Sequence, residues 1–282
     1  MKIFREALTQ GYGQTFSVNK MIFEHKTPHQ HLVIFENERF ARVMALDGII
    51  QTTERDEFIY HEMLTHVPAF AHGNLQNALI IGGGDGGILR ELVKHKTIQT
   101  ITQVEIDQTV IDTCREYLPN HSHGAFDDPR LDLVIDDGMN FVSSTNRRFD
   151  LIISDCTDPV GPGEVLFSTS FYQACKDCLR EGGIFVAQNG VPFFQPEELT
   201  QSSKKLQSLF TDSTFYGVAV PSYVGGIMTL AWATDNRSIR HITVDKLTMR
   251  FQESAIETHY YTPEVHLAAF SLPGYINRLI SG

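Results

Sequence analysis

Acidic residues follow four apolar runs in the central part of the sequence, and these acids are the side chains best suited to chemistry. The runs cover residues 78–81, 98–106, 131–135 and 149–154, and at or just after their ends stand Asp85, Glu105, Asp137 and Asp155. Because the carboxyl ends of parallel strands meet at one edge of a sheet, where α/β proteins bind ligands, we expect these acids to lie close together. Carboxylates gathered at one edge favour a ligand that carries positive charge.

A glycine-rich turn surrounds the first of these acids. Residues 82–87 read Gly-Gly-Gly-Asp-Gly-Gly, and the apolar residues that follow repeat as on one face of a helix. A strand, a glycine turn and a helix start are typical of a nucleotide site, although a plain helix-capping turn would also explain the glycines. Asp85 would disfavour a phosphate and favour a cation. Glu105 stands about 20 residues further on, where nucleotide folds bind the ribose hydroxyls. The pattern therefore predicts a cationic nucleoside rather than a dinucleotide.

A second group of acids lies in residues 155–163, which read Asp-Cys-Thr-Asp-Pro-Val-Gly-Pro-Gly. Asp155 and Asp158 precede a stiff loop that could close over a substrate, although a pair of turn acids is the structural alternative. Cys175 and Cys178 have the CxxC spacing, but they fall within an expected helix and no second pair follows. A zinc site needs further ligands, so we expect no metal.

The composition excludes several classes of protein. The chain has 282 residues and is 42% hydrophobic, which is enough for one large domain and a smaller one. Its 23 basic and 34 acidic residues give a net charge of −11, which disfavours a nucleic-acid partner and would attract a polycation. No apolar run approaches the roughly 18 to 20 residues of a membrane span. Without a signal peptide at the start, the cysteines indicate a reducing, cytoplasmic setting.

Two groups of elements must position the acids. Residues 1–55 contain short β-type runs separated by turn residues, and the Asp47-Gly48 pair predicts a hairpin. We expect a small N-terminal antiparallel β domain, whose exposed edges a second subunit could cover. Residues 51–66 predict a linking helix with Thr53 and Asp56 as a capping box and with Pro68 at its end. Residues 119–130 are polar and predict a loop.

From residue 77 to about 190 strand and helix patterns alternate, which predicts a parallel sheet. Two later runs, 214–220 and 226–234, are joined by a glycine turn and should pair antiparallel. We therefore expect an α/β fold: a Rossmann-like, methyltransferase-type sheet, mostly parallel with an antiparallel edge pair. Residues 235–282 predict helices. The predicted domains are 1–55, an N-terminal β-hairpin domain, and 56–282, a Rossmann-like catalytic domain.

Four motifs together resemble the polyamine aminopropyltransferases, and the bacterial spermidine synthases in particular. They are the glycine turn at 82–87, residues 51–60 (Gln-Thr-Thr-Glu-Arg-Asp-Glu-Phe-Ile-Tyr), residues 155–159 (Asp-Cys-Thr-Asp-Pro) and residues 221–226 (Pro-Ser-Tyr-Val-Gly-Gly). The resemblance covers nearly the whole chain. It implies transfer of the 3-aminopropyl group of decarboxylated S-adenosylmethionine to putrescine, which gives spermidine and 5′-methylthioadenosine. It implies no cofactor, because the nucleoside is a co-substrate. The exposed edges of the N-terminal sheet separately predict a homodimer or homotetramer formed through that domain.

The resemblance also implies roles for individual residues. Asp155 corresponds to the general base, Asp85 to the residue that holds the aminopropyl amine, and His61 and Asp158 to residues that hold the diamine. His61 departs from the animal members, which carry glutamine there, so selectivity among putrescine, cadaverine and agmatine stays open. The remaining positions fall into an amine-channel set and a nucleoside-side set: Tyr60, Gln188 and Tyr223; and Gln30, Gln51, Glu105, Asp137, Gly138 and Pro162.

The chemistry of the expected reaction constrains Asp155. An alkyl amine titrates near 10 and a free aspartate near 4, and this gap opposes simple proton transfer by about 8 kcal/mol. We therefore expect desolvation to lower the pKa of the attacking amine, with Asp155 orienting it and Tyr60 assisting. A methyltransferase shares the fold and is the main alternative, ahead of a dehydrogenase. Ordinary S-adenosylmethionine carries a carboxylate that Asp85 would repel. A polyamine-binding protein without catalysis is the alternative from another class.

Overall fold

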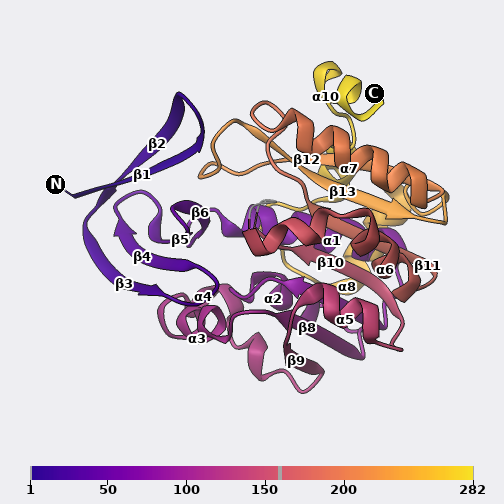
Figure 1. Ribbon diagram of the computed structural model, residues 1–282. Coiled ribbons are helices and arrows are strands. Elements are labelled where there is room, and N and C mark those ends of the chain that lie inside the picture. The colour runs from indigo at the N-terminus through magenta and orange to yellow at the C-terminus, as the bar shows by residue number, and fades with distance from the viewer. Residues whose placement is uncertain (1, 158–160, 282) are drawn as a thin grey trace.

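The computed structural model describes residues 2–157 and 161–281, without the side chains of residues 161 and 162. Its N-terminal part is entirely β (Figure 1): strands β1 (Lys2–Thr9) and β2 (Tyr12–Val18) form a two-stranded hairpin. Strands β3 (Lys20–Lys26), β4 (His31–Asn37), β5 (Ala41–Leu46) and β6 (Ile49–Thr53) form an antiparallel sheet in sequence order. The predicted hairpin at Asp47-Gly48 is confirmed, since both residues adopt positive φ angles, 49° and 85°, between β5 and β6.

A seven-stranded sheet forms the centre of the molecule, in the order β12-β13-β11-β10-β7-β8-β9. The five strands from β11 to β9 pair in parallel, whereas β13 pairs antiparallel with both β11 and β12. The predicted methyltransferase-type sheet with an antiparallel edge pair is therefore confirmed. The strands are β7 (Asn77–Gly82), β8 (Thr100–Glu105), β9 (Leu131–Ile135), β10 (Phe149–Asp155), β11 (Leu179–Gln188), β12 (Asp212–Ala219) and β13 (Ile227–Thr234).

Helices cover both faces of this sheet (Figure 1). In β7 successive side chains alternate between two hydrophobic clusters, with Ala78 and Ile80 in one and Leu79 and Ile81 in the other. The first cluster includes α1 (Glu57–His72), α2 (Gly87–Val93) and α8 (Val244–Ser254). The second includes α5 (Gly138–Ser144), α6 (Thr169–Cys178), α7 (Pro196–Leu209) and α10 (Gly274–Ser281). A strand buried on both faces explains why its sequence is one continuous apolar run.

Helix α1 departs from the prediction at both ends. It begins at Glu57, and the capping box is wrong: Thr53 belongs to β6 and donates a hydrogen bond from its hydroxyl to Asp56 (2.6 Å). The other oxygen of Asp56 accepts the backbone N–H of Ser222. The carboxylate therefore binds a distant loop and caps no N–H group of the helix. Pro68 lies inside the helix, which continues to His72 because α1 is buried along nearly its whole length and packing offsets the missing hydrogen bond.

The region 119–130 is also more regular than predicted. It holds a short helix, α4 (Pro119–Ser122), and a 3-10 turn, η1 (Ala125–Asp127). Its residues Ser122, Ala125 and Phe126 are buried. Packing against the main domain therefore stabilises a regular structure that the polar sequence does not predict. The remaining helices are α3 (Gln108–Tyr117) and α9 (Pro263–Ala269), together with the 3-10 segment η2 (Gly161–Phe167).

The small β part contacts the large domain at both ends of the large sheet. Leu32, Ile34 and Met44 share a hydrophobic cluster with Val110 and Cys114 of α3. The β1–β2 hairpin reaches across to the opposite end of the large sheet. There Gln14 donates to the carbonyl of Ser222 (2.6 Å), and Tyr12 stacks on Phe194 with ring centroids 4.9 Å apart. No helix in the described ranges is long and apolar enough to cross a membrane.

Candidate active site

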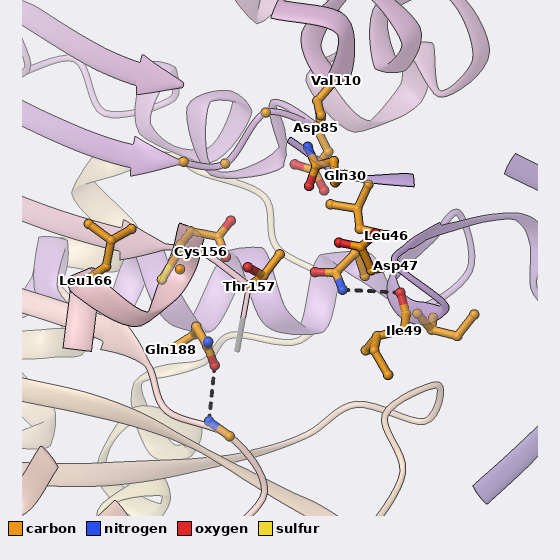
Figure 2. A pocket seen from close by; sticks show the side chains of 18 of the residues that line it. Gln30, Leu46, Asp47, Ile49, Asp85, Val110, Cys156, Thr157, Leu166 and Gln188 are labelled. Atoms are coloured by element: carbon orange, nitrogen blue, oxygen red, sulfur yellow. Dashed lines mark hydrogen bonds between the residues drawn. The ribbon is translucent and has the colours of Figure 1, made fainter. Parts of the chain in front are cut away.

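A cavity of about 570 Å³ opens at the carboxyl ends of the central strands. The opposite wall comes from the small β part and includes residues 6–8 of β1. It also includes residues of β5, β6 and the turn between them, of which Figure 2 labels Leu46, Asp47 and Ile49. All but two of the residues that the sequence indicated line this cavity: Gln30, Gln51, Tyr60, His61, Asp85, Glu105, Asp137, Gly138, Asp155, Gln188 and Tyr223. Asp158 lies outside the described residues. Pro162 belongs to η2, and its side chain is also outside the described part.

The glycine turn brings the ends of β7 and β10 into direct contact. Gly82 has φ +83°, and a side chain there would place its Cβ 1.9 Å from the carbonyl oxygen of Asp155. The next residue, Gly83, donates its N–H to that same oxygen (3.0 Å). Only a residue without a Cβ permits this approach. The turn therefore fixes the position of Asp155 as well as the path toward Asp85.

Asp155 is enclosed at the end of β10, and its carboxylate accepts a hydrogen bond of 2.5 Å from the hydroxyl of Tyr60 on α1. Burial, reinforced by the negative charge of Asp85, raises the pKa of Asp155 to about 6, although the bond from Tyr60 and the charge of His61 act in the other direction. An aspartate with a raised pKa is a better proton acceptor than a free one. The environment of Asp155 therefore reduces the pKa difference between this carboxylate and the attacking amine.

Replacing Tyr60 by phenylalanine is expected to raise the pKa of Asp155, because the hydrogen bond that favours its charged form is lost. Asp155 then keeps its proton at higher pH, so the acid limb of the kcat/KM profile moves toward neutral pH. We expect kcat/KM to fall roughly tenfold or more below the new pKa of Asp155 and to fall less above it. A parallel drop at every pH would mean that Tyr60 does not act through this carboxylate.

Asp85 is an ionised carboxylate held from two sides. One oxygen accepts the backbone N–H of Gly87 at 2.8 Å, and the other faces Nε2 of His61 at 3.2 Å. Despite burial, the adjacent charge of His61 keeps the pKa of Asp85 below its ordinary value. His61 in turn contacts Glu57 through Nδ1 (2.5 Å). Burial acts to lower the pKa of His61, but the carboxylates of Asp85 and Glu57 outweigh it and raise this pKa to about 10.

The nucleoside side of the cavity contains Glu105 at the end of β8. Burial raises its pKa to about 7, and its Oε1 accepts the N–H of Asp107 (3.0 Å). Gly84 lies against it, because a Cβ at that position would be 3.0 Å from Oε2 of Glu105. Asp137 caps α5 by accepting the N–H of Asn140 (3.0 Å). Acceptors at the ends of two neighbouring strands can bind hydroxyl and amino groups of a nucleoside.

The other side of the cavity is formed by β11 and the turn before β13. Gln188 accepts the N–H of Gly190 through its side-chain oxygen (3.1 Å), which orients its amide (Figure 2). Tyr223 donates its hydroxyl to the carbonyl of Gln51 (2.6 Å) and joins the turn to β6. Its ring meets that of Tyr60 edge to face, with centroids 6.0 Å apart. Two tyrosines and an amide give this end a wall suited to an alkyl chain that bears amines.

Sequence reasoning missed several residues that shape the site. Gln103, in the buried strand β8, donates to the carbonyls of Gly82 (3.0 Å) and Gly83 (2.8 Å) and so holds the glycine turn. Glu57 and Arg90 stand behind His61. A polar residue in a buried strand and a carboxylate four positions before a histidine were the available signals. Among the described residues no group of His, Cys, Asp and Glu could hold a metal ion, and Cys175 and Cys178 are buried free thiols.

A Rossmann-like sheet with an antiparallel edge pair and an acidic cavity at its strand ends defines an α/β protein that binds its ligand at the carboxyl edge of the sheet. A family model described as the spermine/spermidine synthase domain matches residues 57–245, and one described as the spermidine synthase tetramerisation domain matches residues 3–54. The chain therefore belongs to the spermine/spermidine synthase family and is an enzyme of the polyamine aminopropyltransferase class.

Individual relatives agree with this assignment. Polyamine aminopropyltransferase 1 of Pseudomonas aeruginosa is 61% identical over 280 residues, which cover 99% of this chain and 98% of the relative. The polyamine aminopropyltransferase of Escherichia coli O1:K1 / APEC is 58% identical over 280 residues, covering 99% and 97%. A crystal structure of spermidine synthase in complex with the transition state analogue AdoDATO superposes with a TM-score of 0.94 at 37% identity and covers 99% and 95%. Spermidine synthase from Thermotoga maritima gives 0.90 at 35% identity, covering 99% and 94%.

Proposed function

We propose that this protein transfers the 3-aminopropyl group of decarboxylated S-adenosylmethionine to putrescine and is a spermidine synthase. The observation that carries the proposal is the placement of Asp85 and Asp155 in one cavity with the nucleoside-side acceptor Glu105. One carboxylate holds the ammonium of the aminopropyl group, and the other faces the attacking amine. The solved relative with a transition state analogue supports this assignment of the cavity.

The reaction forms one bond and breaks one. The neutral amine nitrogen of putrescine attacks the carbon next to the sulfonium, the C–S bond breaks, and sulfur keeps the electron pair as methylthioadenosine leaves. The nitrogen that has formed the new bond is a secondary ammonium, and it loses a proton to Asp155, directly or after passing through it, to give the secondary amine. A sulfonium is a good leaving group, so the protein contributes mainly alignment. With Asp155 at a pKa of about 6 and an ordinary amine near 10, the difference in pKa corresponds to about 5 kcal/mol, and desolvation of the amine reduces it further.

The proposed roles follow the two sides of the cavity. Asp155 is the catalytic residue, and Asp85, His61, Tyr60, Gln188 and Tyr223 form the amine side. Asp158, which lies outside the described residues, has the proposed role of binding the diamine. The nucleoside side consists of Gln30, Gln51, Glu105, Asp137, Gly138 and Pro162. No further cofactor or metal takes part in this scheme. Putrescine is the proposed acceptor, and cadaverine and agmatine are the competing diamines that initial rates on a small panel would rank.

The test is incubation with decarboxylated S-adenosylmethionine and putrescine, followed by mass spectrometry. We expect methylthioadenosine and spermidine in equal amounts. Ordinary S-adenosylmethionine should give no adenosylhomocysteine, because its carboxylate meets Asp85. Formation of adenosylhomocysteine together with no methylthioadenosine would overturn the proposal.

We further propose the setting in which the enzyme works. The domain boundary falls at residues 55 and 56, between the end of β6 and the start of α1. A homodimer or homotetramer forms through residues 1–55, consistent with the description of the model that matches residues 3–54. Four free cysteines are compatible with the cytoplasm, and an acidic chain suits polycationic ligands rather than nucleic acid. Sedimentation analysis with and without residues 1–55 would test the assembly.

A further inference from the structure

A row of alternating charges leads from the cavity into the interior between α1 and α2. Asp85 is the only member whose carboxylate the proposed function places on a substrate. Behind it stand His61 and Glu57, and behind Glu57 stands Arg90, which donates to both oxygens of Glu57 at 2.9 Å. Arg90 also donates to Glu91 (2.7 Å) and to the carbonyl of His121 (2.8 Å). Glu57 and Arg90 do not line the cavity.

Both ring nitrogens of His61 face carboxylates. Nδ1 is 2.5 Å from Glu57 and Nε2 is 3.2 Å from Asp85. A neutral imidazole has one N–H, whereas the imidazolium has two. Donation to both carboxylates therefore requires the protonated ring. A ring that donates at both nitrogens has no lone pair to accept a hydrogen bond from a substrate ammonium.

The ring of His61 also has no freedom to turn. It is 2% exposed, and a Cβ at position 87 would lie 2.2 Å from its atoms, so the backbone of α2 lies against its face. The paired hydrogen bonds from Arg90 fix Glu57, since a bidentate contact sets orientation as well as distance. Charged and titratable groups face the ring from every element packed around it. They are Glu57 and Tyr60 of α1, Asp85 of the glycine turn, Arg90 of α2 and His121 of α4; Asp155 of β10 lies further off.

We propose that Glu57, anchored by Arg90, is a positioning residue for aminopropyl transfer that acts through His61. It holds the imidazolium with Nε2–H aimed at Asp85, so that Asp85 presents its carboxylate to the aminopropyl ammonium in one orientation. His61 then contributes to the amine side of the cavity by orienting Asp85, because both of its ring nitrogens donate to carboxylates. This inference rests on the proposed function, in which Asp85 binds the donor.

The test replaces Glu57 by glutamine, which keeps the shape and removes the charge. With only one carboxylate beside it, the pKa of His61 falls from about 10 by about one unit or more. Because a glutamine can both donate and accept, the neutral ring is no longer forced to direct its N–H at Asp85. We expect kcat/KM for the donor to fall about tenfold where His61 is neutral in the variant and charged in the wild type.

The decisive readout is the ratio of wild-type to variant kcat/KM between pH 6.5 and pH 9. The ionisation of the donor amine cancels in this ratio, so we expect it to rise with pH in step with the titration of His61, followed by NMR of its ring. Glu57→Asp keeps the charge and should restore a ratio that does not depend on pH. Glu62→Gln is the matched control: this carboxylate is buried in the same helix and accepts the N–H groups of His259, Tyr260 and Tyr261.

Each outcome decides the inference. A pH-dependent ratio with a lowered pKa of His61, absent in Glu62→Gln, supports it. An unchanged titration of His61 in Glu57→Gln, or a uniform loss of activity that Glu62→Gln reproduces, overturns it and leaves Glu57 with a structural role. The NMR titration needs no substrate. A wild-type protein that lacks aminopropyl transfer would therefore refute the proposed function separately, while the coupling of Glu57 to His61 is still measured.

Discussion

Replacing Asp155 by asparagine is expected to lower kcat at least a hundredfold, the usual contribution of a positioned general base. The substitution keeps the size of the side chain and its bond to Tyr60, so the geometry of the site persists. What is lost is the proton acceptor, whose pKa of about 6 places it between a free carboxylate and an amine. Affinity for the nucleoside donor should change little.

Single-turnover rates with putrescine across pH would measure this effect. In the wild type we expect the rate to rise as Asp155 loses its proton near pH 6, since only the carboxylate can accept one. In Asp155→Asn that acid limb should vanish together with most of the rate. A variant that reacts within a few-fold of the wild type at every pH would remove Asp155 from proton transfer and leave desolvation of the amine as the whole explanation.

The second large effect concerns Asp85. Asp85→Asn removes the charge that we assign to the aminopropyl ammonium, and a hydrogen bond to a charged group contributes about 1.5–3 kcal/mol. We expect the dissociation constant of decarboxylated S-adenosylmethionine to rise about tenfold to a hundredfold. Binding of ordinary S-adenosylmethionine should weaken far less or improve, because its carboxylate no longer meets a negative charge.

Calorimetric titration with both nucleosides would give the two dissociation constants. The quantity that matters is their ratio, since a general loss of structure would weaken both ligands alike. His61 would also lose one of its two carboxylates, so its pKa should fall in this variant. The negative charge of Asp85 helps to raise the pKa of Asp155, so its removal should lower that pKa. The acid limb of the rate profile should then move to lower pH. Equal weakening of both nucleosides would contradict the role of Asp85 in selecting the donor.

Sequence reasoning recovered the sheet and most of the cavity because both depend on local patterns. Apolar runs such as 149–154 mark buried parallel strands, and the acids at their ends are placed by the rule that strand ends meet at one edge. The bounds of strand β1 within the predicted β domain could not be read from its sequence, because most of its residues are at least partly exposed and no regular alternation results. Helix α5 begins with a glycine and buries only Gly138 and Val142, which leaves no amphipathic signal.

The part of the site that sequence reasoning could not reach depends on contacts between distant residues. Arg90 donates to Glu57, which lies 33 positions away in the sequence, and no local pattern predicts that pairing. The raised pKa of Asp155 depends on burial and on the distance to Asp85, which only the folded chain defines. Similarly, Asp56 was interpreted as part of a capping box, whereas its carboxylate accepts the N–H of Ser222, 166 positions away.

The β1–β2 hairpin limits which segments of the enzyme can be exchanged without changing the substrate cavity. Glu6, Ala7 and Leu8 line the same cavity as Asp155, and Gln14 ties the hairpin to the loop that carries Tyr223. A chimera that exchanged residues 1–55 with those of a relative would therefore exchange part of the substrate's surroundings along with the assembly surface. Differences in diamine preference between relatives can arise in a segment that contributes none of the reacting carboxylates.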